Sequence, residues 1–285
     1  MKSGIINILK PSGMTSNDVL SQIKRKLHPN KIGHLGTLDP NAVGVLPVAI
    51  NKATKLFDYY LKKNKVYNAV FVFGKETDTL DSDGKVLNEC DCDISIGDIE
   101  RILPDFIGKQ EQMPPQYSAK KVNGKNAYEL ARNGIAVELK PKLIEINKIE
   151  LVKQLKKNTF LFTIECSSGT YVRSIARDIA KELNTFAYCG AIIRVKSGHF
   201  DIQSAVTIDD VTEQSIISLE EILKDWKKVF VDSKFYDKIV NGNQIRIGLQ
   251  DMSNVVIICN DKIMGIGNIK NDVLKIETSL WEKND

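Results

Sequence analysis

The 285-residue sequence has no long apolar run and contains little proline or glycine. No stretch approaches the roughly 18 apolar residues of a membrane-spanning helix, and the N-terminal segment lacks the apolar core of a secretory signal. With 18 glycines and 8 prolines, a collagen-like or low-complexity chain is excluded. We therefore expect a globular, cytoplasmic protein without a membrane partner.

Cysteine is also scarce, and its positions suggest neither a disulfide framework nor a metal site. The five cysteines are an odd number and widely scattered: Cys90, Cys92, Cys166, Cys189 and Cys259. The three histidines show no ligand spacing: His28, His34 and His199. We expect reduced thiols and no bound metal.

Neither sign of charge dominates the sequence. Lysine and arginine number 40 and aspartate and glutamate 36, so the net charge of +4 does not by itself imply a nucleic-acid partner. Apolar residues make up 42% and charged residues 27%, which is typical of folded proteins. The length allows one large domain or two.

The hydrophobic pattern predicts more strands than helices. The expected strands span 4–9, 43–50, 66–73 and 159–166, and the expected helices begin after Thr15 and at residue 174. Thr15 can cap the first helix, with Asp18 at its positive end. Since strands and helices do not alternate in a βαβ pattern, we predict an α+β fold with a mixed, mostly antiparallel sheet.

Two further regions stand apart from this pattern. Residues 105–142 contain Asn123-Gly124, a dipeptide typical of tight hairpin turns. From Ser118 to Lys142 there are six basic and two acidic residues, which indicates a basic surface projection. After an expected charged helix over 219–228, four short apolar segments predict a small C-terminal β-domain. We place the two domains at 1–230 and 231–285.

The segment Lys31–Pro40, K-I-G-H-L-G-T-L-D-P, is the first candidate for chemistry. Taken alone, Asp39 before a proline is usually a turn residue, and a lone His34 is more often structural than catalytic. A phosphate-binding loop is not supported, because Gly74-Lys75 lacks the upstream glycine and is followed by glutamate. No nucleotide cofactor is therefore expected.

Three further segments change the interpretation of this loop. Residues 67–84 read Y-N-A-V-F-V-F-G-K-E-T-D-T-L-D-S-D-G, residues 112–125 read Q-M-P-P-Q-Y-S-A-K-K-V-N-G-K, and residues 167–173 read S-S-G-T-Y-V-R. With H-L-G-T-L-D-P, and in this order, they make residues 4–205 resemble the TruB type of bacterial tRNA pseudouridine synthase. The second segment resembles that family's RNA-gripping insertion, and the C-terminal β-segment looks like a PUA-type RNA-binding domain.

The resemblance implies a role for individual residues. Asp39 matches the family's catalytic aspartate, and Arg173 matches the arginine that pairs with it. The residues that match contacts to the flipped-out uridine or to bases around it are His34, Tyr67, Tyr171 and Ile192. On the insertion, the lysines expected to meet phosphates are Lys120, Lys121 and Lys125. Ile193 stands where the family usually has arginine, and Leu35 where threonine is common.

The implied reaction converts uridine to pseudouridine. It breaks the N1–C1′ bond, rotates the uracil and joins C5 to C1′, and it needs no cofactor because no redox change, group donor or hydrolysis is involved. Asp39 would attack C1′ or abstract a sugar proton, and a neighbouring guanidinium would keep its carboxylate ionised. Tyr67 would stack on the uracil and help to remove the C5 proton, and His34 would fill the gap left by the extruded base.

The expected substrate is the T-arm stem-loop of tRNA, whose position-55 uridine would be isomerised by a monomeric enzyme without a guide RNA. Two alternatives stay open at this point. A guide-RNA-dependent synthase would resemble the Asp39 loop but lack the 105–142 insertion as it stands here. A non-catalytic RNA-binding module would need the basic surface but not Asp39, Tyr67 and Arg173 together.

Overall fold

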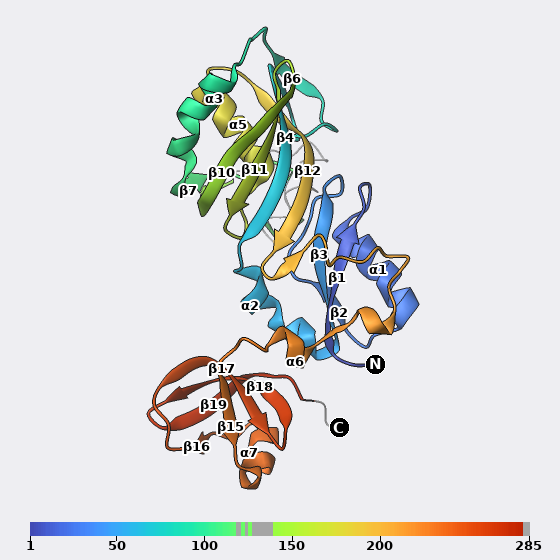
Figure 1. The fold of residues 1–285 in the computed structure, drawn as a ribbon, viewed down its shortest axis with the longest axis vertical. Coiled ribbons are helices and arrows are strands. Elements are labelled where there is room, and N and C mark those ends of the chain that lie inside the picture. The colour runs from blue at the N-terminus through green and yellow to red at the C-terminus, as the bar shows by residue number, and fades with distance from the viewer. Residues whose placement is uncertain (118–120, 123–124, 127–138, 282–285) are drawn as a thin grey trace.

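A computed structural model describes residues 1–117, 121–122, 125–126 and 139–281 of the chain. A large sheet with helices on its faces occupies the upper and middle parts of the molecule, and a small curled sheet lies at the lower end (Figure 1). The large sheet is mostly antiparallel, which confirms the predicted α+β class. None of the helices in the described part of the chain is long and apolar enough to span a bilayer.

The large sheet has the strand order β14-β1-β3-β12-β4-β11-β10-β7, with β2 beside β3 and β13 beside β12. Its strands are β1 (Gly4–Lys10), β2 (Ile32–His34), β3 (Val43–Ile50), β4 (Lys65–Phe73), β7 (Gly108–Gln112), β10 (Lys142–Lys156), β11 (Thr159–Cys166), β12 (Ala187–Ser197), β13 (Phe200–Asp201) and β14 (Ile217–Ser218). The helices beside this sheet are α1 (Ser16–Leu27), α2 (Phe57–Leu61), α3 (Ile96–Ile102), α5 (Val172–Glu182) and α6 (Leu219–Ile222), with short 3-10 helices at Asn51–Leu56, Leu103–Phe106 and Glu213–Ser215.

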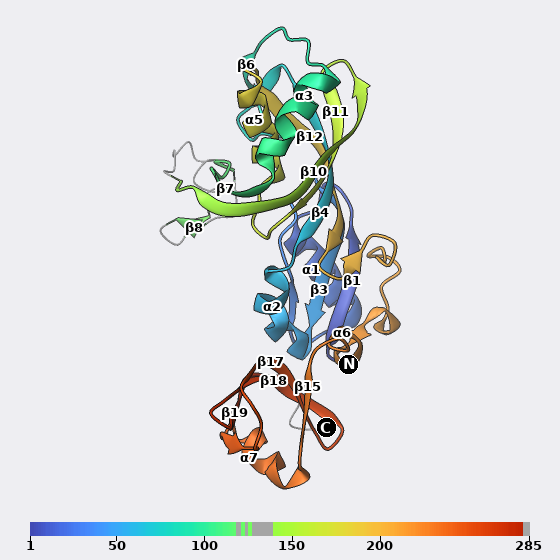
Figure 2. The same ribbon diagram turned by 60° about the vertical axis from the view of Figure 1, so that its left-hand side comes forward.

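The strands β4 and β11 form where the sequence alternates as expected. In β11, Phe160, Phe162 and Ile164 are fully buried, and in β4 Ala69 and Phe71 face the same core. These strands pack against α3 and α5, which lie on one face of the sheet (Figure 2). The predicted strands at 4–9, 43–50, 66–73 and 159–166 are therefore confirmed.

The helix after Thr15 is also confirmed. The Thr15 hydroxyl accepts from the Asp18 N–H at 3.1 Å, and the Asp18 carboxylate accepts from the Thr15 N–H at 2.9 Å. This capping box satisfies two backbone donors at the start of α1. Val19 and Ile23 then pack beneath β1 and β3.

The large sheet consists of two antiparallel halves that meet at a narrow junction. β12 pairs with β3 in parallel, through only Ile193 opposite Val43 and Arg194 opposite Gly44. Gly44 has φ +116, and a Cβ there would collide with the Arg194 backbone, so the close approach requires glycine. Beyond these two residue pairs, β3 pairs with β1 and β2, and β12 pairs with β4 and β13.

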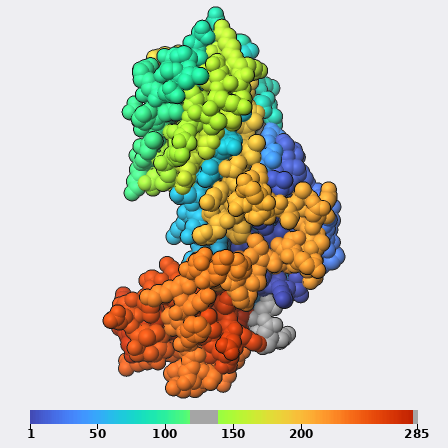
Figure 3. All heavy atoms as spheres, in the orientation of Figure 1, coloured from blue at the N-terminus to red at the C-terminus, as the bar shows by residue number. Residues whose placement is uncertain are grey.

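The small sheet has the order β15-β17-β18-β19-β16. Its elements are β15 (Lys228–Val231), α7 (Tyr236–Val240), β16 (Ile245–Arg246), β17 (Met252–Cys259), β18 (Lys262–Lys270) and β19 (Val273–Ser279), with a 3-10 turn at Ser233–Phe235. The four strands expected from the apolar segments are present, whereas β15 and α7 were not predicted. The space-filling view shows this part as a separate lobe below the large sheet (Figure 3).

The expected helix over 219–228 is wrong. α6 ends after one turn, and the Trp226 N–H donates to Leu223 O at 3.1 Å as the chain reverses. This turn lets the Trp226 ring pack edge-on against Tyr59, with ring centroids 5.4 Å apart. Packing of the partly buried indole thus overrides the charged helical pattern, and Lys228 begins β15.

The segment 105–142 does not lie wholly outside the sheet. Residues 108–112 form β7, the edge strand paired with β10, so any projection begins after Gln112. Two short hairpins complete the described elements: β5 (Lys75–Thr77) with β6 (Val86–Glu89), and β8 (Lys121–Val122) with β9 (Lys125–Asn126). The turn at Asn123-Gly124 and Lys120 lie outside the described residues, and β8 and β9 are described only as paired backbone.

Candidate active site

A cavity of about 480 Å³ opens where the two halves of the large sheet separate. Its walls come from the loop before β3, from β4 and β12, from the end of α2 and from the loop that precedes α5. Among the predicted site residues, those that line it are Asp39, Tyr67, Tyr171, Arg173 and Ile192. The tertiary structure thus brings together side chains from four segments that are remote in the sequence.

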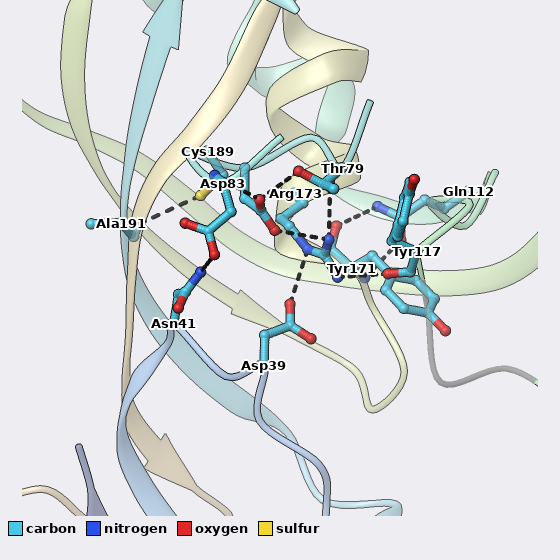
Figure 4. Close-up of polar contacts among 11 residues, drawn as sticks. Asp39, Asn41, Thr79, Asp83, Gln112, Tyr117, Tyr171, Arg173, Cys189 and Ala191 are labelled. Carbon is cyan, nitrogen blue, oxygen red and sulfur yellow. Dashed lines mark hydrogen bonds and ion pairs between the residues drawn. The ribbon is translucent and has the colours of Figure 1, made fainter. Parts of the chain in front are cut away.

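Arg173 holds Asp39 at the rim of this cavity. Arg173 Nε lies 2.9 Å from Asp39 Oδ2, and the guanidinium is almost fully buried while the carboxylate is 42% exposed (Figure 4). Two nitrogens of the same guanidinium bind Asp81 Oδ2 at 3.1 Å and Tyr117 O at 3.0 Å. One carboxylate is therefore oriented by a rigid cation and still open to a substrate.

Buried polar side chains fix the backbone of the loop that carries Asp39. Arg194 is 1% exposed and donates to Val45 O, Thr37 O and Gly36 O at 2.7, 3.0 and 3.1 Å. Behind Asp39, Ser16 Oγ donates to Leu38 O at 3.1 Å and accepts from the Leu38 N–H at 3.0 Å. The loop is thus clamped on both sides of the carboxylate.

Lys10 provides a third clamp on the same loop. Its ammonium donates to Pro40 O at 2.8 Å, to Pro11 O at 2.8 Å and to Met14 O at 2.6 Å. Burial lowers the pKa of Lys10 to about 8, and the Arg194 charge acts in the same direction. The charge on Lys10 therefore depends on pH near the alkaline end of the physiological range.

Tyr67, Tyr171 and Ile192 supply the flat and apolar walls. Burial raises the pKa of the Tyr67 hydroxyl, so this group carries its proton at neutral pH. Tyr171 stands at the N-terminus of α5, where its N–H donates to Gln112 Oε1 at 2.8 Å and its carbonyl accepts from Gln112 Nε2 at 3.1 Å. These rings can face a planar base, and the Asp39–Arg173 pair lies beside them.

His34 is not among the residues that line the cavity. It ends β2, opposite Val48 of β3, and its Nδ1 is buried without a hydrogen-bond partner. Burial lowers the pKa of the imidazole, as does the nearby Arg194 charge, so the ring is neutral at pH 7. Its role toward an extruded base remains a prediction.

Three residues that hold the site together were not singled out from the sequence. Asp81 and Gln112 were visible only as members of the segments 67–84 and 112–125, and Arg194 only as the neighbour of Ile193. Lys65 is buried, and its ammonium group donates to Leu61 O and Lys63 O at 2.7 and 2.6 Å. Ile193 is 39% exposed, and Leu35 belongs to the core.

A metal site is not evident from side-chain placement. No group of three His, Cys, Asp or Glu side chains within the described ranges is arranged to hold an ion. The polar side chains that line the cavity instead consist of one carboxylate, four cations and several hydroxyl groups.

Comparisons with known proteins agree with this geometry. A family model described as "TruB family pseudouridylate synthase (N terminal domain)" matches residues 24–172. A "tRNA pseudouridine synthase B" of Alkaliphilus oremlandii is 36% identical, covering 99% of each chain, and one of Clostridium novyi is 41% identical, covering 98% of this chain and 99% of the relative. The same description applies to a protein of Mesoplasma florum that is 41% identical over 91% of this chain and 90% of its own length.

Solved structures show the same fold. A "Cbf5-Nop10-Gar1 Complex" has a TM-score of 0.73 at 23% identity, covering 99% of this chain and 86% of the other. An H/ACA RNP bound to a substrate RNA containing 2'-deoxyuridine has a TM-score of 0.72 at 22% identity with the same coverages.

The family match over more than half of the chain and the full-length relatives define the class of enzyme, a pseudouridylate synthase and hence an isomerase. Within that class, the chain belongs to the TruB family, as its four motifs indicated.

Proposed function

We propose that this enzyme isomerises the T-loop uridine at position 55 of tRNA to pseudouridine, without a cofactor and without a guide RNA. The observation that carries the proposal is the Asp39–Arg173 pair at 2.9 Å, exposed to a cavity with Tyr67, Tyr171 and Ile192 in its walls. The names of the full-length bacterial relatives support tRNA as the substrate.

Asp39 acts at C1′ of the target uridine, either by attack at that carbon or by removal of a sugar proton. Both routes need an ionised carboxylate held at the sugar, and a guanidinium fixed by several bonds supplies that orientation at no cost during the reaction. Arg173, which is itself bound by Asp81, holds the Asp39 side chain in one position. The hydrogen bonds from Arg194 hold the backbone of the loop that carries it.

The uracil occupies the space beside the tyrosine rings. A base stacked on an aromatic side chain gains about 1–3 kcal/mol, which offsets part of the cost of extruding it from the folded loop. Tyr67 keeps its proton, so its stacking does not depend on charge. His34, neutral and flat, would contact a base of the opened loop rather than the one in the cavity.

Lys120, Lys121 and Lys125 of the insertion bind phosphates of the T arm, and the small C-terminal sheet acts as a PUA-like RNA-binding unit. We propose that the enzyme works as a monomer in the cytoplasm. The role of the lysines rests on their positive charge, because phosphates dominate the affinity of RNA-binding surfaces. The other assignments rest on the resemblance to the family.

The test is incubation of the purified protein with an unmodified tRNA transcript, followed by mapping of pseudouridine. We expect modification at one T-loop uridine with no other RNA present. Tight tRNA binding without any pseudouridine would instead support a non-catalytic RNA-binding module, and a requirement for a second RNA would support a guided synthase.

A further inference from the structure

The charges that line the cavity do not balance. One carboxylate, Asp39, faces four cationic side chains: Lys65, Lys142, Arg173 and Arg194. Arg173 is paired with Asp39, while Arg194 and Lys65 donate to backbone carbonyls. A cavity with this excess of positive charge suits a ligand that brings negative charge of its own.

Among the described residues, Lys142 is the one cation of this set whose side chain makes neither an ion pair nor a hydrogen bond. It is the first residue of β10, its side chain is exposed, and none of the acidic residues in the described ranges forms an ion pair with it. Its charge also acts on Lys65, whose pKa is lowered to about 8, mainly by burial and then by the charges of Arg194 and Lys142. Two cations thus share one side of the cavity.

The loop before α5 is fixed against the start of β10. The Ser167 N–H donates to Glu145 O at 2.8 Å, and Ser167 Oγ accepts from the Glu145 N–H at 2.9 Å. At its other end, Tyr171 is bound twice by Gln112, the residue directly opposite Lys142 in the β7–β10 ladder. These bonds hold the middle of the loop beside the Lys142 side chain.

Gly169, at the middle of this loop, leaves the space in which the ammonium group lies. A Cβ at this position would collide with Lys142 Nζ, and the positive φ of +79° also favours glycine. Both residues line the cavity together with Thr170 and Ser168. This part of the cavity lining is therefore built around one exposed ammonium group.

We propose that Lys142 binds a phosphate that flanks the target uridine, and that Gly169 makes room for this contact. The inference rests on the proposed function, because a nucleotide drawn into the cavity from an RNA chain carries a phosphate on either side of its sugar. An ammonium group binds phosphate as a compact charge from several directions, so it can follow the phosphate as the nucleotide turns inward.

The experiment uses T-arm stem-loop RNAs that each contain one neutral methylphosphonate linkage. The linkage is placed 5′ of the target uridine, 3′ of it, or in the stem, and dissociation constants are measured for wild type and Lys142→Gln. On unmodified RNA, Lys142→Gln should bind roughly tenfold more weakly, as expected for one charge-assisted hydrogen bond. One flanking neutral linkage should weaken wild type by a similar factor and leave Lys142→Gln almost unchanged.

The matched control is Lys153→Gln, at the exposed far end of the same strand. This variant should keep the full wild-type response to the flanking neutral linkage. If the flanking linkages weaken wild type and Lys142→Gln equally, or if only the stem linkage couples to Lys142, the proposal is overturned.

Gly169→Ala provides a second variant that leaves the lysine in place. The added methyl group displaces the ammonium, so binding should weaken about as much as in Lys142→Gln and lose its response to the flanking linkage. Alanine is also strained at this φ, so thermal unfolding is measured alongside, and a folded variant with the full response would contradict the role given to Gly169.

These outcomes separate the inference from the proposed function. Pseudouridine mapped in unmodified RNA after incubation with wild type tests the function alone. An active wild type without coupling at either flanking phosphate overturns only the inference, whereas coupling in binding without pseudouridine formation overturns only the function.

Discussion

Asp39 and Asp81 lie on separate loops and bind the same guanidinium, that of Arg173. Nε of Arg173 lies 2.9 Å from Asp39 (Figure 4), and Nη1 lies 3.1 Å from Asp81. A hydrogen bond from Asn41 to Asp83 joins the same two loops beside the pair. Asp81 thus acts on Asp39 through Arg173, as a positioning residue.

Asp39→Asn should reduce turnover to background while tRNA still binds. The amide keeps the size and one acceptor of the carboxylate but lacks its charge, so it can neither attack C1′ nor take a sugar proton. Single-turnover formation of pseudouridine and the dissociation constant for tRNA measure the two effects. Appreciable turnover, with deamidation excluded by mass spectrometry, would contradict the role of Asp39.

Arg173→Met should lower the single-turnover rate by roughly 100-fold or more, because Asp39 loses the group that positions it. It should also reduce the free energy of unfolding by about 1–3 kcal/mol, since buried acceptors lose their donor. Asp81→Asn is the milder variant and should lower the rate less, with tRNA affinity unchanged. A wild-type rate in both variants would show that Arg173 does not orient Asp39.

Substitutions of Tyr67 separate its ring from its hydroxyl. Tyr67→Leu removes the stacking surface and should cost about 1–3 kcal/mol of base stacking, with a lower single-turnover rate. Tyr67→Phe retains the ring, so it should keep most of the rate if stacking is the main contribution. A Phe variant as slow as the Leu variant would assign the rate to the hydroxyl, including its part in removal of the C5 proton.

Lys10 should make the rate fall as the pH rises through about 8. Its pKa is lowered to that value by burial, and the neutral amine has fewer donors for the three carbonyls that it holds, including that of Pro40. The Asp39 loop then loses one clamp. The single-turnover rate of wild type should decline above pH 8, whereas Lys10→Met should be slower at pH 7 and lack this decline.

Unfolding provides the control for that experiment. The folded protein releases the Lys10 proton near pH 8 and the unfolded chain near 10.5, so between these values the unfolded state binds more protons. The contribution of Lys10 to the free energy of unfolding therefore rises with pH in this window. We therefore expect the rate to fall with pH while the free energy of unfolding of wild type rises relative to that of Lys10→Met, which would assign the slower rate to loosening of the Asp39 loop alone. If the free energy of unfolding of wild type instead falls relative to that of the variant, this explanation is refuted.

Replacement of Lys120, Lys121 and Lys125 by Gln should flatten the salt dependence of tRNA binding. Each lysine that no longer neutralises a phosphate should reduce the slope of log affinity against log salt by roughly 0.7–0.9. At saturating tRNA the chemical step should be almost unchanged, and Tyr67→Leu should show the converse pattern, with an intact slope and a slower step. If the triple variant keeps the wild-type slope, these lysines do not bind phosphates and the insertion is only a solvated surface hairpin.

Local patterns in the sequence predicted the elements of the fold well. The alternation of Phe160, Phe162 and Ile164 and the Thr15–Asp18 cap are short-range signals, so they identify a strand and a helix start without knowledge of the rest of the chain. The expected helix at 219–228 failed because Trp226 packs on Tyr59, a contact from a distant segment. A contact between distant segments produces no periodic pattern of apolar residues from which it could be predicted.

The sequence by itself determined the family of this protein, because the motifs around Asp39, Tyr67 and Arg173 follow one another in a recognisable order. Only the tertiary structure decided how those groups are held. Asp81 reaches Arg173, and Arg194 reaches the Asp39 loop, through hydrogen bonds whose geometry depends on the junction between the two halves of the sheet. Likewise, Lys142 lies against Gly169 because the loop before α5 is bound to the strands β7 and β10. Distances across a fold depend on the packing of all its elements, and no local pattern specifies them.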